Sequence, residues 1–496
     1  MTNADIISLY SPEANVTVCK ADEWWKDSWD PTAYGRKLDL SASFFEQFAA
    51  LETEVPRPSL HVISNENCEY VNQCGFSKDC YLSFNTDYCE RCCYCKNVIR
   101  SRDCLDVLNS EECELSYECA DLQLCYDVIG CLHCKNSNAL VFCRDCNACR
   151  DCIGCINLRN KQYCIFNTQV TKEEYAALLA MYRNGSYQSL SELRNQAAAF
   201  FLTQPRRATE LLQCENSDGD GLRNCKNCHH CFDCFSDEDI TYCSVTSRAK
   251  DIYDNDTGGY DSELCMEMIS SGMNNVRCMF CTNHWGNCSD TCYCEIMVNC
   301  QHCFGCIGLR NKEYCILNKQ YSKEEFEKLV RLIIEGMRTR GEWGEFMPVA
   351  LSPFGYNETV AQEYFPLTKN EVLRKGWKWS DFEMPPPQVK KSIKAHDLPD
   401  LTDSVPDDIL NWAIECEITK RPFKIIKQEL DFYRQMKLPI PRRHPDQRHR
   451  DRMALRNPRK LWNRSCANCQ KQIATSYAPE RPEMVYCEQC YLETVY

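Results

Sequence analysis

Small and apolar side chains recur at every third position over residues 61–165 and 213–318, and polar side chains fill most of the positions between them. In the first stretch, 18 of 19 cysteines share one frame of three, and only Cys93 lies outside it. The other positions in this frame hold mainly Ser, Thr, Val and Leu. The pattern predicts that one residue in three points into a narrow interior.

A period of three matches neither a helix face, which repeats every 3.6 residues, nor a simple strand, which repeats every two. Long 3₁₀ helices are poor in geometry, and residues 68–164 contain no Pro and three Gly, which argues against a polyproline helix. Stacked short strands and turns remain. We therefore predict a mixed, mainly β fold: two cysteine-rich β-solenoid-like repeats with helical connectors and a C-terminal zinc ribbon.

The two stretches are internal repeats of one another. The segment from Cys152 to Cys164 matches that from Cys303 to Cys315 at an offset of 151 residues. Of the 15 cysteines from 225 to 315, 11 keep the frame. The exceptions are Cys265, Cys278, Cys281 and Cys292. They predict an insertion near residues 251–263.

Helices are predicted after each array and near the N-terminus. Thr171 with Glu174, and Ser322 with Glu325, form capping boxes. The predicted helices cover residues 41–53, 172–183, 189–203 and 323–340.

The 41 cysteines in 496 residues bear on the compartment and on metal binding. No secretory signal is visible and no apolar run reaches 18 residues, so we expect a cytoplasmic protein with reduced thiols. Three interpretations of the arrays stay open: packed thiols, metal clusters (Fe–S or several zinc ions) in the densest runs, and redox-active thiols. Val107, Val128 and Leu140 occupy the same frame, which favours packing, because a metal ligand cannot be replaced by Val.

The strongest site signal is at the C-terminus. Cys466, Cys469, Cys487 and Cys490 follow the pattern C-x₂-C-x₁₇-C-x₂-C, which is typical of a Cys₄ zinc ribbon. Four protein ligands leave no position for a catalytic water, so one structural zinc is predicted. Two eroded ribbons are also visible. Cys416 and His444 stand where knuckles would lie, and Cys19 resembles a lone second half for which no metal is expected.

The net charge is −14, yet residues 437–464 carry ten Lys or Arg against two acids. Basic side chains beside a ribbon often neutralise phosphates, and this predicts contact with nucleic acid. The alternative is that they pair with the acidic body of the chain. The candidate residues are Arg442, Arg443, Arg448, Arg450, Arg452, Arg456, Arg459 and Lys460.

Several segments carry a resemblance across nearly the whole chain. They are Trp24–Pro31, Phe44–Phe48, Leu351–Val360, Arg456–Trp462 and the ribbon. The chain resembles a family of uncharacterised cysteine-rich, zinc-ribbon-flanked proteins of uncultured, genome-reduced bacteria. The resemblance implies an architecture and no activity.

These observations predict a non-enzymatic zinc-binding scaffold or interaction protein that contacts a protein or nucleic-acid partner. The alternative is a redox or metal-handling protein that uses the arrays. No catalytic residue, small-molecule substrate or membrane contact is indicated, since no HExxH, GxSxG or Walker motif appears. The predicted segments are an N-terminal segment 1–60, solenoid one 61–165, a helical connector 166–212, solenoid two 213–318, a helix 319–345, a linker 346–400 and a basic zinc-ribbon module 401–496.

Overall fold

Two long stacks of short parallel strands dominate the computed structural model, which describes residues 6–495. The predicted mixed, mainly β class is confirmed. The strands of the first stack are β3 (Val62–Ile63), β4 (Asn72–Gly75), β5 (Phe84–Asp87), β6 (Lys96–Ile99), β7 (Arg102–Glu111), β8 (Glu114–Ala120), β9 (Tyr126–Ile129), β10 (Asn138–Val141), β11 (Arg150–Ile153), β12 (Gln162–Ile165) and β13 (Thr168–Gln169).

The second stack is built in the same way and follows the first in the chain. Its strands are β16 (Gly219–Asp220), β18 (Cys231–Phe232), β19 (Glu238–Thr241), β20 (Ser244–Thr246), β21 (Lys250–Gly258), β22 (Met266–Ile269), β23 (Met279–Thr282), β24 (Ser289–Cys292), β25 (Gln301–Phe304), β26 (Glu313–Ile316) and β27 (Lys319–Gln320). At the start of this stack, β15 (Leu211–Leu212) and β17 (Leu222–Arg223) pair in a separate two-stranded sheet.

Each turn of the first stack, which we call a rung, contains twelve residues. Leu140 pairs with Cys152, and Cys152 pairs with Cys164, all in parallel. Isolated bridges outside the strands keep the same spacing. Every third residue has a left-handed backbone, as at Asp103 and Asp106. The next residue points inward, which is the physical origin of the period of three.

Inward side chains also form hydrogen bonds with the backbone of the next rung. The Cys143 N–H donates to Sγ of Cys131 (3.4 Å), whose own thiol donates to the Leu140 carbonyl (3.6 Å). Ser83 Oγ likewise accepts from the Cys95 N–H (3.3 Å). An amide without a partner in a dry interior costs about 1–3 kcal/mol. Small side chains that both donate and accept therefore suit these positions, which favours the packed-thiol interpretation.

The cysteines outside the frame have two different explanations. Cys93 and Cys292 directly precede the left-handed residues Tyr94 and Tyr293, so they lie outside the interior and pack under neighbouring segments. Cys265, Cys278 and Cys281 are inward, but their rungs contain thirteen residues. The predicted single insertion near 251–263 is thus corrected: the register is offset by thirteen from Tyr253↔Met266 through Met279↔Cys292.

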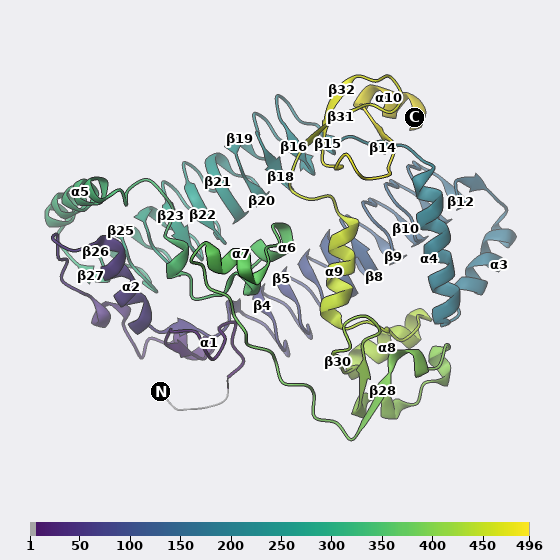
Figure 1. The fold of residues 1–496 in the computed structure, drawn as a ribbon, viewed down its shortest axis with the longest axis horizontal. Helices are drawn as coiled ribbons and strands as arrows, with labels where there is room; N and C mark the ends of the chain where they lie inside the picture. The colour runs from purple at the N-terminus through teal and green to yellow at the C-terminus, as the bar shows by residue number, and fades with distance from the viewer. Residues whose placement is uncertain (1–5, 496) are drawn as a thin grey trace.

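The predicted helices are present. α2 (Phe44–Glu54), α3 (Lys172–Tyr182), α4 (Tyr187–Leu202) and α5 (Lys323–Arg340) correspond to the four expected segments. Both capping boxes form, at Thr171 and at Ser322. α3 and α4 lie at one end of the molecule, and α2 and α5 lie at the other (Figure 1).

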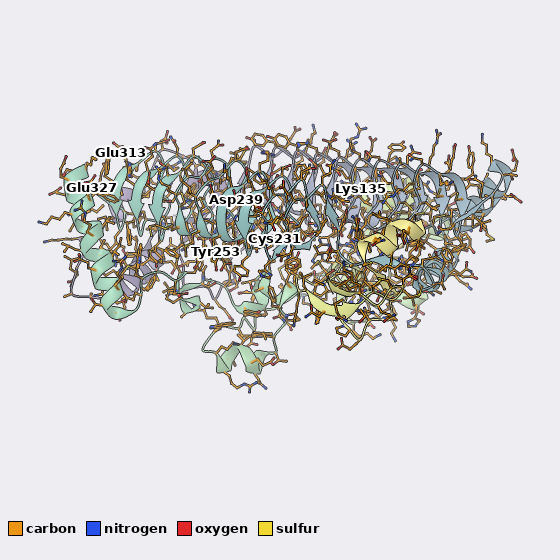
Figure 2. The ribbon with its side chains drawn as sticks, turned by 90° about the horizontal axis from the view of Figure 1, so that it is seen from above. Lys135, Cys231, Asp239, Tyr253, Glu313 and Glu327 are labelled. Carbon is orange, nitrogen blue, oxygen red and sulfur yellow. The ribbon has the colours of Figure 1, made fainter. Side chains whose placement is uncertain are left out.

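The two stacks run side by side along the long axis (Figure 1). Seen from above, the rungs form a row along which Glu313, Asp239 and Lys135 follow in order (Figure 2). Arg223 of the second stack donates to Gln123 of the first (2.9 Å). No helix in the described part of the chain is long and apolar enough to cross a membrane.

The segment predicted as an irregular linker contains structure. It holds α6 (Ala361–Tyr364), α7 (Lys369–Arg374) and β28 (Lys391–Lys394). β28 pairs with β29 (Trp412–Glu415), which also pairs with β30 (Pro422–Phe423). The C-terminal module therefore begins before residue 401. It continues through α8 (Lys427–Met436), α9 (Pro445–Leu455), β31 (Trp462–Ser465), β32 (Gln472–Thr475), β33 (Val485–Tyr486) and α10 (Glu488–Val495).

Candidate metal centre and basic segment

The four C-terminal cysteines converge on one point. β31 and β32 form an antiparallel hairpin whose turn carries Cys466 and Cys469. Cys487 and Cys490 come from the start of α10. One ligand atom from each residue lies within 4.8 Å of the others. The predicted grouping of Cys466, Cys469, Cys487 and Cys490 is confirmed as a group that could hold a metal ion.

One sulfur–sulfur distance in this group matches the distance expected around a tetrahedral zinc ion. A Zn–S bond of about 2.3 Å places two ligand sulfurs about 3.8 Å apart. The Cys469 and Cys487 sulfurs are 3.7 Å apart. Since all four ligands would come from the protein, the group has the chemistry of a structural site.

The backbone around Cys466 prepares its sulfur for a metal. The Cys487 N–H donates to the Cys466 sulfur (3.2 Å). Burial raises the pKa of this thiol, but N–H donors from Cys469, Cys487 and Asn468 outweigh it and lower the pKa to about 6. Thiolate is the form that binds metal. The turn thus stabilises the ligand form before any ion binds.

The ribbon is anchored to the first stack and to the connector that follows it. β33 pairs in parallel with β14 (Arg206–Arg207), which follows α4. The Tyr491 hydroxyl of α10 hydrogen-bonds to the Asn157 side chain (3.0 Å). Thr475 donates to the Ala208 carbonyl (2.6 Å). A metal that orders the ribbon therefore also orders this contact.

The eroded second ribbon keeps the knuckle backbone without a full ligand set. The Cys416 N–H donates to the Arg421 carbonyl (3.0 Å), as the Cys466 N–H donates to that of Lys471 (2.8 Å). Lys420 and Gln470 share a left-handed conformation. Thr419 stands where the ribbon has Cys469. His444 caps α9 through Nδ1, which accepts from the Asp446 N–H (3.1 Å). This cap occupies one ring nitrogen of the predicted ligand.

The N-terminal trace also has the backbone of a half ribbon. β1 (Val18–Cys19) pairs in parallel with β2 (Arg57–Pro58), and α1 (Ala21–Trp24) follows. This order matches β33 and α10. The Cys19 thiol donates to the Arg57 carbonyl (3.6 Å).

The basic segment, residues 442–460, forms many of its ion pairs within the chain, and contact with nucleic acid stays a prediction. Arg448 and Arg452 are buried and both pair with buried Asp106, each at 2.7 Å. Arg456 bridges the stacks, because it pairs with Asp121 at 2.9 Å and Asp233 at 2.5 Å. A guanidinium already paired in a buried site is not available to a phosphate.

The remaining candidates divide in the same way. Arg459 pairs with Asp256 (3.1 Å), and Arg443 pairs with Glu417 and Asp451 (2.7 Å each). Arg442 stacks over the Tyr187 ring at 4.0 Å. Of the eight predicted residues, Arg450 and Lys460 are exposed. The alternative weighed from the sequence, pairing with the acidic body, is what the structure shows for most of the segment.

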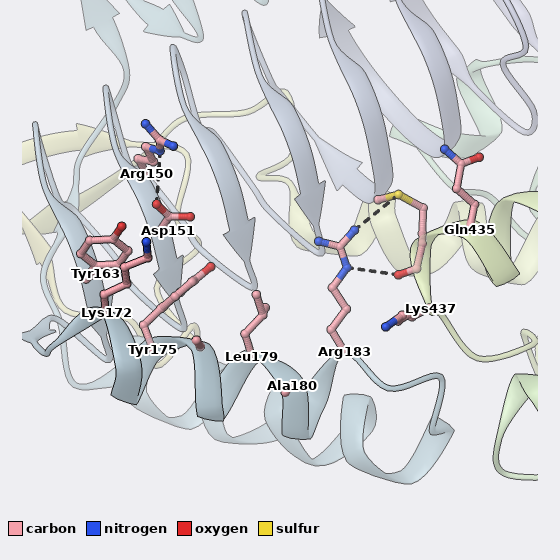
Figure 3. Close-up of a pocket in the computed structure, with 12 residues that line it drawn as sticks. Arg150, Asp151, Tyr163, Lys172, Tyr175, Leu179, Ala180, Arg183, Gln435 and Lys437 are labelled. Carbon is pink, nitrogen blue, oxygen red and sulfur yellow. Dashed lines mark hydrogen bonds and ion pairs between the residues drawn. The ribbon is translucent and has the colours of Figure 1, made fainter.

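A shallow groove lies where α3 meets the first stack and the end of α8 (Figure 3). Twelve residues line a hollow of about 540 Å³. Two of its arginines have local partners: Arg150 pairs with Asp151 (3.2 Å), and Arg183 donates to the Met436 carbonyl (3.1 Å). Sequence reasoning did not single out this groove, because its residues come from three distant segments.

Comparison with known proteins adds little. No protein-family model matches the chain, and no curated protein matches it. Among solved structures, a chain described as an acetyltransferase from Desulfovibrio desulfuricans G20 matches with 7% identity and a TM-score of 0.10, over 49% of this chain and 63% of that one. At that TM-score the likeness carries no argument about fold or activity.

Proposed function

We propose that the chain is a zinc-stabilised scaffold in which two β-solenoids present long surfaces to a partner. The observation that carries the proposal is the four-cysteine group, whose ligand set is complete without solvent or substrate. A site filled by four thiolates stabilises structure rather than catalysing a reaction. In comparable peptides the binding free energy is on the order of 10–16 kcal/mol.

The zinc acts at the point where the C-terminal module closes on the rest of the chain. The ribbon holds β33 against β14. The basic segment that leads into the ribbon holds the two stacks together through Arg456. Metal binding therefore fixes the relative position of two surfaces that are distant in sequence, which is what a scaffold requires.

The stack surfaces suit recognition of a polar partner. Ion pairs run between successive rungs on the outside, as between Arg91 and Asp103 (2.7 Å) and between Arg277 and Asp290 (2.7 Å). Such pairs contribute little to stability. They leave regular rows of charge along the molecule, and these rows are the surface that we assign to partner binding.

The test is to count zinc in the full chain purified without oxygen, and to repeat the count with Cys469→Ser plus Cys490→Ser. The proposal expects the variant to lose one zinc per chain and to exchange the amides of β14 and β33 faster with deuterium. A matched control is Cys68→Ser, which removes a partly exposed array thiol and should change neither result.

Two outcomes would refute the proposal. An unchanged metal count in the double variant would show that the ribbon holds no zinc. A brown iron–sulfur absorbance lost on mutating array cysteines would favour the alternative, a redox or metal-handling protein. Binding of nucleic acid that vanishes with Arg450→Ala and Lys460→Ala would support the nucleic-acid interpretation on those two side chains.

A further inference from the structure

Three successive rungs of the second stack each contain one extra residue at the same corner. Along most of both stacks the inward positions are three apart. Here they are four apart, from Gly258 to Ser262, from Ser271 to Asn275, and from His284 to Cys288. Ser271, His284 and Met297 stack one above another at intervals of thirteen residues. The extra residues enlarge the turn where an inward histidine must be accommodated.

His284 is the largest inward side chain of its rung and is 1% exposed. The rung's other inward residues are Asn275, Cys278 and Cys281, each 0% exposed. Neither ring nitrogen of His284 has a hydrogen bond of good geometry to any residue that the structure describes, and the polar groups that face the ring are thiols. A buried polar group without a partner costs about 1–3 kcal/mol. An imidazole in this position can gain a partner for one ring nitrogen by binding a metal ion.

Three thiols surround this ring. Those of Cys278, Cys281 and Cys288 lie within interaction range of the imidazole, two from its own rung and one from the next. The Cys281 sulfur also accepts the Cys294 N–H (3.4 Å), a bond that stabilises a thiolate. Three sulfurs and one imidazole nitrogen form a common ligand set for structural zinc.

We propose that Cys278, Cys281, His284 and Cys288 form a buried zinc site inside the second stack, independent of the ribbon. The ligand atoms are more spread than in the ribbon, where all four lie within 4.8 Å. Binding thus requires small side-chain rotations that draw the sulfurs inward. The three thiols then give up bonds to carbonyl oxygens, such as that from Cys281 to Met279 (3.1 Å).

Burial sets the kinetics of this site. Cys469 of the ribbon is exposed, whereas all four proposed ligands are buried. A metal cannot reach them without opening the stack, so the site loads as the chain folds. We expect a chelator to remove the ribbon zinc from native protein quickly and the second zinc only after unfolding.

The experiment uses the full chain with the ribbon disabled by Cys469→Ser plus Cys490→Ser, refolded with Zn²⁺ and then desalted. One zinc per chain is expected by elemental analysis. Adding His284→Met, which copies Met297 of the next rung, should reduce the count to zero. Adding His302→Asn, at a partly exposed histidine of the same stack, should leave it at one.

Zinc-edge X-ray absorption of the ribbon-disabled chain tests the ligands without touching the stack. One nitrogen and three sulfurs are expected around the metal. A count of zero in the ribbon-disabled chain, retention of zinc with His284→Met, or a four-sulfur shell would each overturn the proposal. If instead the ribbon holds no zinc, disabling it leaves the wild-type count unchanged, so the two sites are tested separately.

Discussion

The buried ion-pair cluster around Asp106 should hold the C-terminal module on the first stack. Asp106 is 0% exposed and contacts Arg448 and Arg452 at 2.7 Å each. Arg448 also contacts buried Glu429 (3.2 Å), which accepts from the Tyr433 hydroxyl (2.6 Å). With Asp106→Asn, Arg448 would keep Glu429, and Arg452 would lose the carboxylate that it contacts. Removing one partner of a buried pair costs about 3–5 kcal/mol.

Asp103→Asn is a matched control. Asp103 lies three residues away in the same left-handed conformation, and Asn tolerates that conformation well. Its pair with Arg91 is partly exposed, with 23% and 38% of the two side chains accessible. Such a pair contributes about 0–1 kcal/mol. The two substitutions thus differ in burial and not in chemistry.

Native-state hydrogen exchange of the α9 amides gives the measurement, because it reports local opening of the module. A loss of 3–5 kcal/mol corresponds to exchange faster by roughly a hundredfold to several thousandfold, since 1.4 kcal/mol is about tenfold. Asp103→Asn should change the rates by less than about fivefold. Equal effects of the two variants, or less than fivefold for Asp106→Asn, would refute the argument that burial makes this cluster strong.

Three further predictions concern other contacts in the structure. Arg456→Met removes the closest cationic partner of both Asp121 and Asp233 between the stacks, and it should destabilise the protein by about 3–5 kcal/mol in urea unfolding. Arg248→Met at an exposed pair should cost less than about 1 kcal/mol. Cys131→Ser should be tolerated better than Cys131→Val in thermal unfolding, because Val leaves the Cys143 N–H without its acceptor; equal losses would contradict the inward hydrogen-bond argument. Burial opposes ionisation of Glu363, but His449 and Lys96 lower its pKa to about 2. The ionised carboxylate should therefore stabilise the fold fully above about pH 4.5, and this stabilisation should be lost as the pH falls toward 2. Glu363→Gln should flatten that part of the curve of unfolding free energy against pH.

Most of the fold prediction rested on the period of three. It located the interior correctly because a left-handed residue at every third position permits few alternatives. It could not give the twelve-residue rung, since three, six or twelve residues per turn produce the same frame. The rung length is set by backbone pairing between residues such as Leu140 and Cys152, which leaves no trace in a single sequence.

The ribbon was predictable for a related reason: the spacing of its cysteines reflects the geometry of one ion. The pairing of the basic segment could not be predicted from the sequence. A run of arginines has the same composition whether it faces solvent or buried aspartates. The partners Asp106, Asp121 and Asp233 lie more than 200 residues away in the sequence and stand at ordinary array positions. His284 was also missed, because the frame shift hid that it points inward.

The three thirteen-residue rungs restrict how this chain can change length. Each takes its extra residue at one corner, and Cys265, Cys278 and Cys281 beyond those corners still point inward. A residue added along a strand instead would move the side chains that follow it to the wrong face. Single-codon insertions in such a gene should therefore be kept at this corner and rejected along the strands. A descendant of this protein should grow one residue at a time along one edge of the stack.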